Sequence, residues 1–230
     1  MKKYILITVL AAAGLWGCNE DSLDASITVD SNFQTGDAGE DGWIPGYAGY
    51  AATADSSQLD TVAATALLPR GLDTTQYGFR ILSRYSKGNM FSYLKKRVTG
   101  FKPGKSYRMT LQVDLASNYT AEAVVGKVAF KAGVSVDEPL TKLVSGTYTF
   151  NLDKGTVAQP GKAVLLSGSI ASTNSNALYY TLISYSNDSQ PITVTANSNG
   201  ELWFYAGTDS DYKDTTIFYF DRIIARFKEL

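Results

Sequence analysis

The chain has 230 residues with 21 basic and 22 acidic side chains, no histidine and a single cysteine, Cys18. A net charge of −1 provides no basic excess for a nucleic-acid backbone, so we do not expect nucleic acid as a partner. Without histidine or a second cysteine, the chain lacks the residues of Ser-His-Asp and Cys-His catalysis and of the usual zinc and copper sites. An internal disulfide is excluded as well, and any bound metal would be a hard cation such as calcium.

Residues 1–17 have the organisation of a secretory signal peptide. Two lysines precede an apolar run over residues 4–13, which is too short for a membrane-spanning helix of about 20 residues. The segment ends in Leu-Trp-Gly-Cys at residues 15–18, which resembles a bacterial lipobox and implies that Cys18 is lipidated and anchors the mature protein. Trp16 stands where a small residue is usual, so ordinary secretion and a retained anchor helix remain alternatives.

Residues 18–26 are interpreted as an acidic tether between the anchor and the folded domain. The acidic residues that follow Cys18, namely Glu20, Asp21 and Asp24, resemble the surface-export signal of lipoproteins in the Bacteroides group. This resemblance implies an outer-membrane lipoprotein that is exposed at the cell surface, with the membrane as a partner through the lipid anchor. A solvated acidic linker without an export signal is the alternative.

Residues 27–230 are predicted to form one all-β domain. Residues 35–60 are rich in Gly, Ala and Asp and predict long loops. Strand signals then recur to the C-terminus, at residues 92–98, 107–115, 128–132, 147–152, 163–170, 192–196, 202–206 and 215–227. Residues 92–98 also fit one helical turn, but no segment beyond the leader has convincing helical periodicity.

Two of the predicted strands have clear positions in a sheet. Residues 107–115 alternate apolar side chains with Arg, Thr, Gln and Asp, which predicts a strand with one buried face. Residues 215–227 are rich in β-branched and aromatic residues, which predicts a central strand. Turn residues separate the strands at regular intervals. The pattern predicts a single β-sandwich of the jelly-roll or galactose-binding-like type.

Short motifs along the domain resemble a family of secreted or lipid-anchored bacterial proteins that has no assigned activity. They are Gly42-Trp43, Gly46-Tyr47-Ala48, Lys95 to Gly104 leading into Tyr107, Ala116-Ser117-Asn118, Lys131-Ala132-Gly133, Glu138-Pro139, Asn151 to Gly155, Ser186-Asn187, Asn199 to Trp203 and Gly207 to Ser210. The resemblance implies an all-β sandwich and no particular reaction. The chain departs from the family at Gly49, at Gly88-Asn89 and in a shorter loop at residues 119–125. Relatives have acidic residues at the first two places, so a cation site formed there would be incomplete in this chain.

The two ends of the domain resemble carbohydrate-binding jelly rolls. Asn32-Phe33-Gln34 followed by Gly42-Trp43 is similar to their opening element, and Phe218 to Asp221 is similar to their closing aromatic strand. This resemblance implies that the first and last strands pair and that a structural calcium ion lies near the seam. Gln34 replaces the usual carboxylate, which weakens the expectation of calcium.

Aromatic residues in the Gly-rich segment are the candidate ligand-binding residues: Trp43, Tyr47 and Tyr50. Flat aromatic faces stack on the apolar faces of sugar rings, and loops at the end of a sandwich carry binding sites. For Trp43 the alternative is a core position next to a glycine. Further along the chain, Trp203 and Tyr205 fall on one face of a strand, and we expect Trp203 to lie in the core.

Acidic residues supply the remaining candidates. Asp209, Asp211 and Asp214 are close enough in sequence to predict a calcium site through their oxygens, although a solvated acidic loop is the alternative. Asp221-Arg222 lies in the last predicted strand, and we expect Arg222 on its less buried face in a structural ion pair. Glutamates well inside the domain, which a glycoside hydrolase would need as a pair, are Glu122, Glu138 and Glu201.

Together these observations favour a non-catalytic, surface-exposed lipoprotein that binds a glycan or another extracellular polymer through loop aromatics. A structural or adhesive subunit of the envelope that acts by protein contacts is the first alternative. A carboxylate-dependent polysaccharide enzyme is the second.

Overall fold

The computed structural model describes residues 26–34 and 42–230; the leader, Cys18 and residues 19–25 of the acidic tether lie outside them, whereas Ser26, the last residue of the predicted tether, already belongs to the first strand. The strands in chain order are β1 (Ser26–Ser31), β2 (Ile44–Ala48), β3 (Tyr50–Ala51), β4 (Leu59–Leu67), β5 (Tyr77–Tyr85), β6 (Met90–Val98), β7 (Ser106–Ser117), β8 (Val128–Ser135), β9 (Thr141–Val144), β10 (Thr147–Phe150), β11 (Leu166–Ser169), β12 (Thr181–Ser186), β13 (Ile192–Thr195), β14 (Leu202–Ser210) and β15 (Thr216–Glu229). A single helical turn, α1 (Ala121–Val124), follows β7. Within the described residues, no helix is long and apolar enough to cross a membrane.

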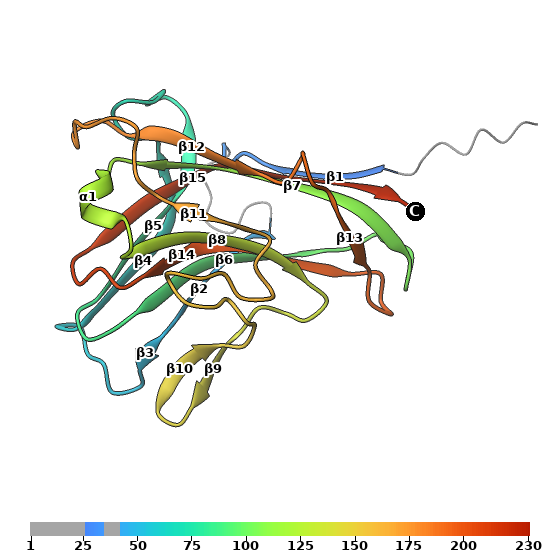
Figure 1. The fold of residues 1–230 in the computed structure, drawn as a ribbon, viewed down its shortest axis with the longest axis horizontal. Coiled ribbons are helices and arrows are strands. Elements are labelled where there is room, and N and C mark those ends of the chain that lie inside the picture. The colour runs from blue at the N-terminus through green and yellow to red at the C-terminus, as the bar shows by residue number, and fades with distance from the viewer. Residues whose placement is uncertain (1–25, 35–41) are drawn as a thin grey trace, which may run out of the picture.

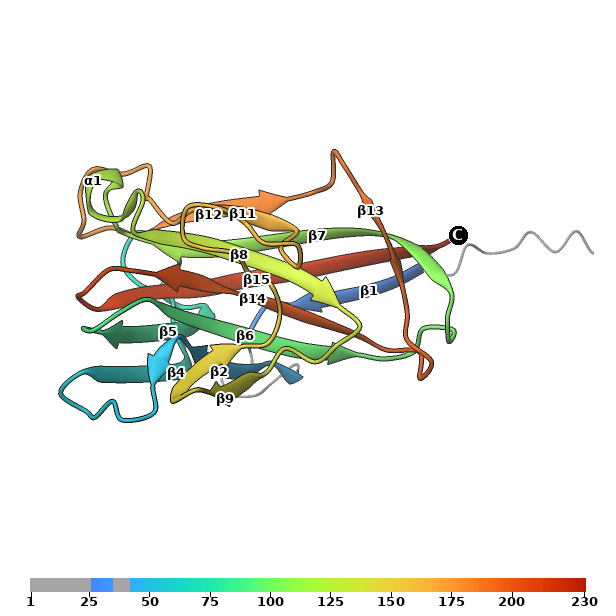
Figure 2. The same ribbon diagram turned by 60° about the horizontal axis from the view of Figure 1, so that its bottom comes forward.

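The strands form two facing sheets and a small third sheet (Figures 1 and 2). The first sheet has the order β12-β7-β15-β5-β4, with β1 added to β15 and β13 added to β7. The second sheet has the order β11-β8-β14-β6-β2, and the small sheet has the order β3-β10-β9. Figure 1 shows the small sheet below the second sheet, on the side away from the first. The predicted all-β, jelly-roll type of sandwich is confirmed.

The core lies between the two large sheets. In β7 the alternate residues Met109, Leu111, Val113 and Leu115 are buried, as the period of two predicts. β15 lies between β7 and β5 in the first sheet and contributes the buried Phe218, Phe220 and Ile223, which confirms the predicted central strand. β1 pairs with β15, so the first and last strands are neighbours, as the resemblance to jelly rolls implied.

The N-terminal half of the domain has more strands than predicted. β2 and β3 fall inside residues 35–60, where long loops were predicted, and β4 begins at Leu59. Tyr47 and Tyr50 therefore lie on short strands instead of on a loop. α1 corrects the expectation that no helix follows the leader, although it is only four residues long.

The outer face of the second sheet carries a second cluster of buried aromatic residues. Phe91, Tyr93 and Tyr205 point away from the main core and pack against Phe150, Leu152 and Ala163. These last three residues come from β10 and the segment at residues 151–165, which covers the sheet. Gly133 of β8 allows this close approach, because a Cβ there would collide with the carbonyl of Ala163. Both faces of the second sheet are therefore buried over part of their area.

Candidate functional site

The structure contradicts the prediction of Trp43 as a ligand-binding residue. Its side chain is 1% exposed and belongs to the main core, so the indole presents no face to a ligand. Tyr47 is half-buried, packs against the same core, and has a buried hydroxyl without a partner among the described residues. Burial, assisted by the nearby Asp60, raises the pKa of Tyr47 to about 12. The ligand-binding prediction is therefore wrong for Trp43, whereas for the half-buried Tyr47 it stays a prediction.

Tyr50 has a different environment. It lies opposite Tyr148 of β10, and the two half-buried rings are 5.0 Å apart between centroids, tilted by 35°. Leu143 of β9 lies opposite Tyr148 on its other side and is 57% exposed. Because opposed residues of antiparallel strands share a face, Tyr50, Tyr148 and Leu143 form one row across the small sheet, called here the tyrosine row. Sequence reasoning missed Tyr148, since only the pairing of β3 with β10 places it beside Tyr50.

The predicted calcium ligands do not come together. Asp209 is fully buried in β14, whereas Asp211 is exposed and pairs with Lys213 at 2.6 Å. Asp214 is exposed and accepts a hydrogen bond from the N–H of Thr215 at 2.7 Å. Among the residues that the structure describes, no group of three His, Cys, Asp or Glu side chains is placed to hold a metal ion. The calcium site at these residues is therefore wrong, because β14 continues through Asp209 and separates it from the exposed loop.

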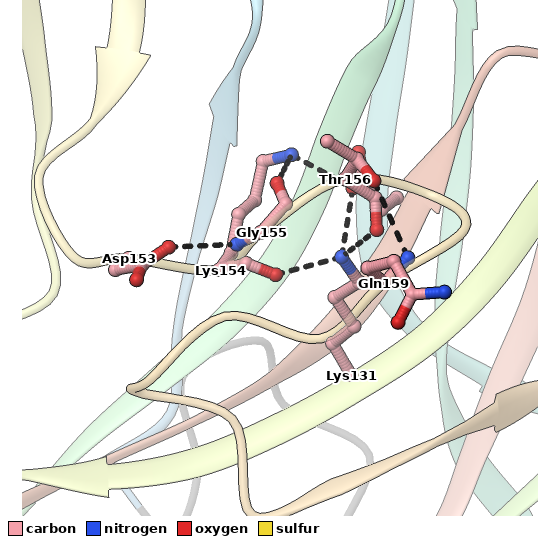
Figure 3. A network of polar contacts seen from close by, with 7 residues as sticks. Lys131, Asp153, Lys154, Gly155, Thr156 and Gln159 are labelled. Atoms are coloured by element: carbon pink, nitrogen blue, oxygen red, sulfur yellow. Dashed lines mark hydrogen bonds and ion pairs between the residues drawn. The ribbon is translucent and has the colours of Figure 1, made fainter.

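Asp209 instead binds two lysines through one carboxylate oxygen. Its Oδ2 accepts hydrogen bonds from Nζ of Lys131 at 3.1 Å and from Nζ of Lys154 at 2.7 Å. Lys131 is fully buried and also donates to the carbonyls of Lys154 and Thr156, at 2.7 and 2.5 Å. Figure 3 shows the Lys131 side chain reaching up from β8 to these carbonyls. Burial lowers the pKa of Lys131, and the charge of Asp209 opposes this shift. The three N–H groups of Lys131 fix residues 154–156 to the sheet.

A cavity of about 420 Å³ lies above this network. Its polar lining comes from Asn89, Lys154, Thr156, Asp209 and Asp211, and the rest comes from Gly126, Gly155, Val157 and Ala158. A second cavity of about 390 Å³ shares Gly126, Val157 and Ala158 and continues along β8 and β11, where Val125, Val128, Ala129 and residues 167–169 line it. The two cavities are therefore adjacent.

The first cavity also adjoins the tyrosine row. Gly49, which precedes Tyr50, has a φ of +97° and packs so closely on Asn89 that a Cβ would lie 2.5 Å from the Asn89 carbonyl oxygen. Gly49 and Asn89, which lie at two of the three places where the chain departs from the resembling family, are thus in contact. The tyrosine row, Asn89 and the cavity form one continuous area on the outer side of the second sheet.

The other singled-out charges are in ion pairs. Glu138 pairs with Lys95 at 2.6 Å, and Glu201 pairs with Arg97 at 3.5 Å. These pairs leave neither glutamate as an isolated acid or base. Trp203, which was expected in the core, is half-exposed, and Nζ of Lys95 lies 5.5 Å from its ring centroid.

Arg222 is exposed and donates two hydrogen bonds to Asp30, at 2.8 and 2.6 Å, which confirms the expected structural pair.

No family model and no curated protein matches the chain. Among solved structures, the K3 cleaved adhesin domain of Lys-gingipain from Porphyromonas gingivalis is similar, with a TM-score of 0.45 and 12% identity over 87% of this chain and 98% of that one. TmCBM27, a carbohydrate-binding module that recognises mannan, has a TM-score of 0.42 and 6% identity over 88% and 98%. The K1 adhesin domain of the same gingipain has a TM-score of 0.41 and 13% identity over 88% and 98%. Similarities at this level support no inference about function.

Proposed function

We propose that the protein is a non-catalytic, surface-exposed lipoprotein that binds an extracellular glycan through the tyrosine row. The observation that carries this proposal is the pair of half-buried rings of Tyr50 and Tyr148, 5.0 Å apart on one face of a small sheet. Aromatic rings present broad apolar faces, on which the C–H faces of sugar rings stack. Strand pairing fixes both rings in place, so little side-chain freedom is lost on binding.

The anchor is the second part of the proposal. Cys18 is lipidated and becomes the mature N-terminus, and the acidic tether carries the domain to the outer surface of the outer membrane. Incorporation of a labelled fatty acid into the wild-type chain, and its loss in Cys18→Ser, tests the lipid. Digestion of the protein by a protease added to intact cells tests exposure, and a protected protein would refute it.

Glycan binding is tested with the full-length chain in a polyoxyethylene detergent, because alkyl glycosides would compete as sugars. A glycan array identifies retained polysaccharides, and affinity electrophoresis then compares variants. We expect Tyr50→Ala and Tyr148→Ala to lower the affinity about tenfold or more each, and Tyr50→Phe to retain it. Tyr179→Ala is the matched control, because Tyr179 is half-buried like Tyr50 and Tyr148. The proposal fails when no glycan is retained, or when the two alanine variants bind as the wild type does.

The adhesive alternative has one observation in its favour. Leu143 and Val144 are 57% and 53% exposed on β9, which is an edge strand of the small sheet. An exposed edge with apolar side chains suits the addition of a strand from a protein partner. In that case Val144→Lys would abolish capture of the protein partner, whereas it would leave glycan binding by the opposite face of the strand unchanged.

A further inference from the structure

We propose that the cavity above Asp209 is a sugar subsite that holds two neighbouring hydroxyl groups of one uncharged sugar residue. This inference rests on the proposed glycan binding and adds a second contact region to it. The tyrosine row supplies apolar stacking, whereas the cavity supplies hydrogen bonds. The two regions meet at the contact between Gly49 and Asn89.

The first argument is an unused hydrogen-bond acceptor. Asp209 is fully buried and lines the cavity, and its Oδ1 has no hydrogen-bond partner among the described residues. Its other oxygen already accepts hydrogen bonds from two lysines. A buried carboxylate oxygen without a donor is costly, and native proteins rarely leave one unsatisfied. A ligand hydroxyl that donates to Oδ1 would remove this cost.

The second argument is a donor next to that acceptor. Nζ of Lys154 lies 2.7 Å from Oδ2 of Asp209, and its next contact, with the Gly155 carbonyl, is a long 3.4 Å. An ammonium group has three N–H donors, so Lys154 retains capacity to donate to a ligand. The acceptor, Oδ1 of Asp209, and the donor, Nζ of Lys154, are neighbours because Lys154 is hydrogen-bonded to the other oxygen of the same carboxylate. Such a pair suits a vicinal diol, in which one hydroxyl donates and its neighbour accepts. Asn89 adds an amide that does both.

Charge selects an uncharged ligand. Lys131 and Lys154 stand against Asp209 in the buried cluster, while Asp211 and Lys213 pair with each other at the rim. An anionic group in the cavity would approach both Asp209 and Asp211. A cationic group would approach Lys154, the lysine that lines the cavity. A neutral polyhydroxylated ring meets neither repulsion, and a cavity of about 420 Å³ lies within the range of small-molecule sites.

The subsite is rigid before a ligand binds. Lys131 holds the carbonyls of Lys154 and Thr156, so the segment that carries the donor is fixed to β8. Nζ of Lys154 also lies 5.6 Å from the ring centroid of Phe91, which limits where the ammonium group can move. Preorganised groups lose little freedom on binding, and this is how a few hydrogen bonds give specificity.

The experiment uses the full-length chain, a polysaccharide retained on the array, and its neutral methyl glycosides as probes, compared with the corresponding uronates. We expect the neutral glycosides to show saturation transfer in ligand-observed NMR, and the uronates to show none. Lys154→Met, which keeps the side-chain length, and Asn89→Ala should each lower the affinity for the polysaccharide about tenfold. Lys213→Met, at an exposed lysine of the rim, is the matched control and should bind as the wild type does.

The outcomes separate the two proposals. When Tyr50→Ala weakens binding but both Lys154→Met and Asn89→Ala bind normally, the subsite is refuted and the proposed function stands. Preferential binding of uronates refutes the charge argument and with it the subsite as described. When no polysaccharide is retained by the wild type, the proposed function itself has failed. Loss of saturation transfer in Lys154→Met, with an unchanged unfolding transition, supports the subsite.

Discussion

Replacement of Lys131 by methionine tests whether the buried charge network holds the covering segment on the second sheet. Lys131 is fully buried and donates to Asp209 and to the carbonyls of Lys154 and Thr156. Methionine is unbranched and fills a similar space without a donor. The variant therefore leaves two carbonyls without their donor and Asp209 with Lys154 alone.

The expected cost follows from these lost contacts. Removal of one partner from a buried ion pair costs about 3–5 kcal/mol, and each carbonyl that remains buried without a donor costs about 1–3 kcal/mol. In this variant Lys154 still neutralises Asp209. The side chain of Lys154 is 17% exposed, so its ammonium group can shift to keep contact with the carboxylate. We expect Lys131→Met to lower the free energy of unfolding by about 3 kcal/mol or more. Lys131→Met combined with Asp209→Leu should recover part of this loss, because no buried carboxylate then remains with Lys154 as its single counter-ion.

Urea unfolding of the full-length chain, followed by tryptophan fluorescence, measures the effect. A lower midpoint with an unchanged slope would show a loss of stability without a change in the folded structure. Lys213→Met removes an exposed pair and should change the free energy by less than about 1 kcal/mol. A cost below about 1 kcal/mol for Lys131→Met would refute the reasoning, because it would place the network among weak surface pairs.

Three further variants and one pH titration test other parts of the structure. Tyr47→Phe should raise the free energy of unfolding by up to about 1 kcal/mol, because it removes a buried hydroxyl that has no partner within residues 26–34 and 42–230. Tyr119→Phe should lower the free energy of unfolding, because that hydroxyl donates to the Thr215 carbonyl and accepts from the Ile217 N–H; urea unfolding compares the two variants. Gly49→Ala should lower the free energy of unfolding by about 1–3 kcal/mol, because the φ of Gly49 is +97° and an alanine there is strained. It should also weaken glycan binding, because the new Cβ would displace Asn89. Urea unfolding measures the first effect and affinity electrophoresis the second. Burial raises the pKa of Tyr47 and Tyr180 to about 12 from the ordinary tyrosine value of 10. The stabilisation that their neutral forms provide is therefore complete below pH 10 and is lost as the pH rises through about 12. Circular dichroism measured against pH should show unfolding between these two values.

The sequence predicts the fold where alternation is strong. β7 and β15 are correct because their buried side chains are large and their periodicity is clear. β5 was overlooked although its pattern is readable, since Phe79 and Ile81 are buried and Arg80 and Arg84 are less so. β4 gives a weaker signal because three of its six apolar residues are alanine, whose small side chains also suit loops and helices.

The candidate site was harder to predict because long-range pairing creates it. A period of two places Trp43 and Tyr47 on one face, and both point into the core. The chain turns at Gly49, so Tyr50 leaves that face and joins a different sheet, in which Tyr148 is its partner. The ion pair of Lys131 and Asp209 joins residues 78 positions apart. No local pattern signals such a pair: Lys131 lies between Phe130 and Ala132 as a surface residue of a strand would, and Asp209 lies between the polar Thr208 and Ser210.

The features of this domain that cost folding stability lie close together, and their position indicates where a function is located. A sandwich needs only one buried face in each sheet, yet here a polar segment also covers the outer face of the second sheet. Beneath it lie a fully buried lysine and a carboxylate oxygen that has no partner in the described part of the chain, and beside it Gly49 adopts a left-handed conformation against Asn89. Apolar residues at positions 131 and 209 would pack the same sheet without the cost of burying charge. Sequences break such rules mainly at functional sites, so the area between the tyrosine row and the cavity is where binding is expected.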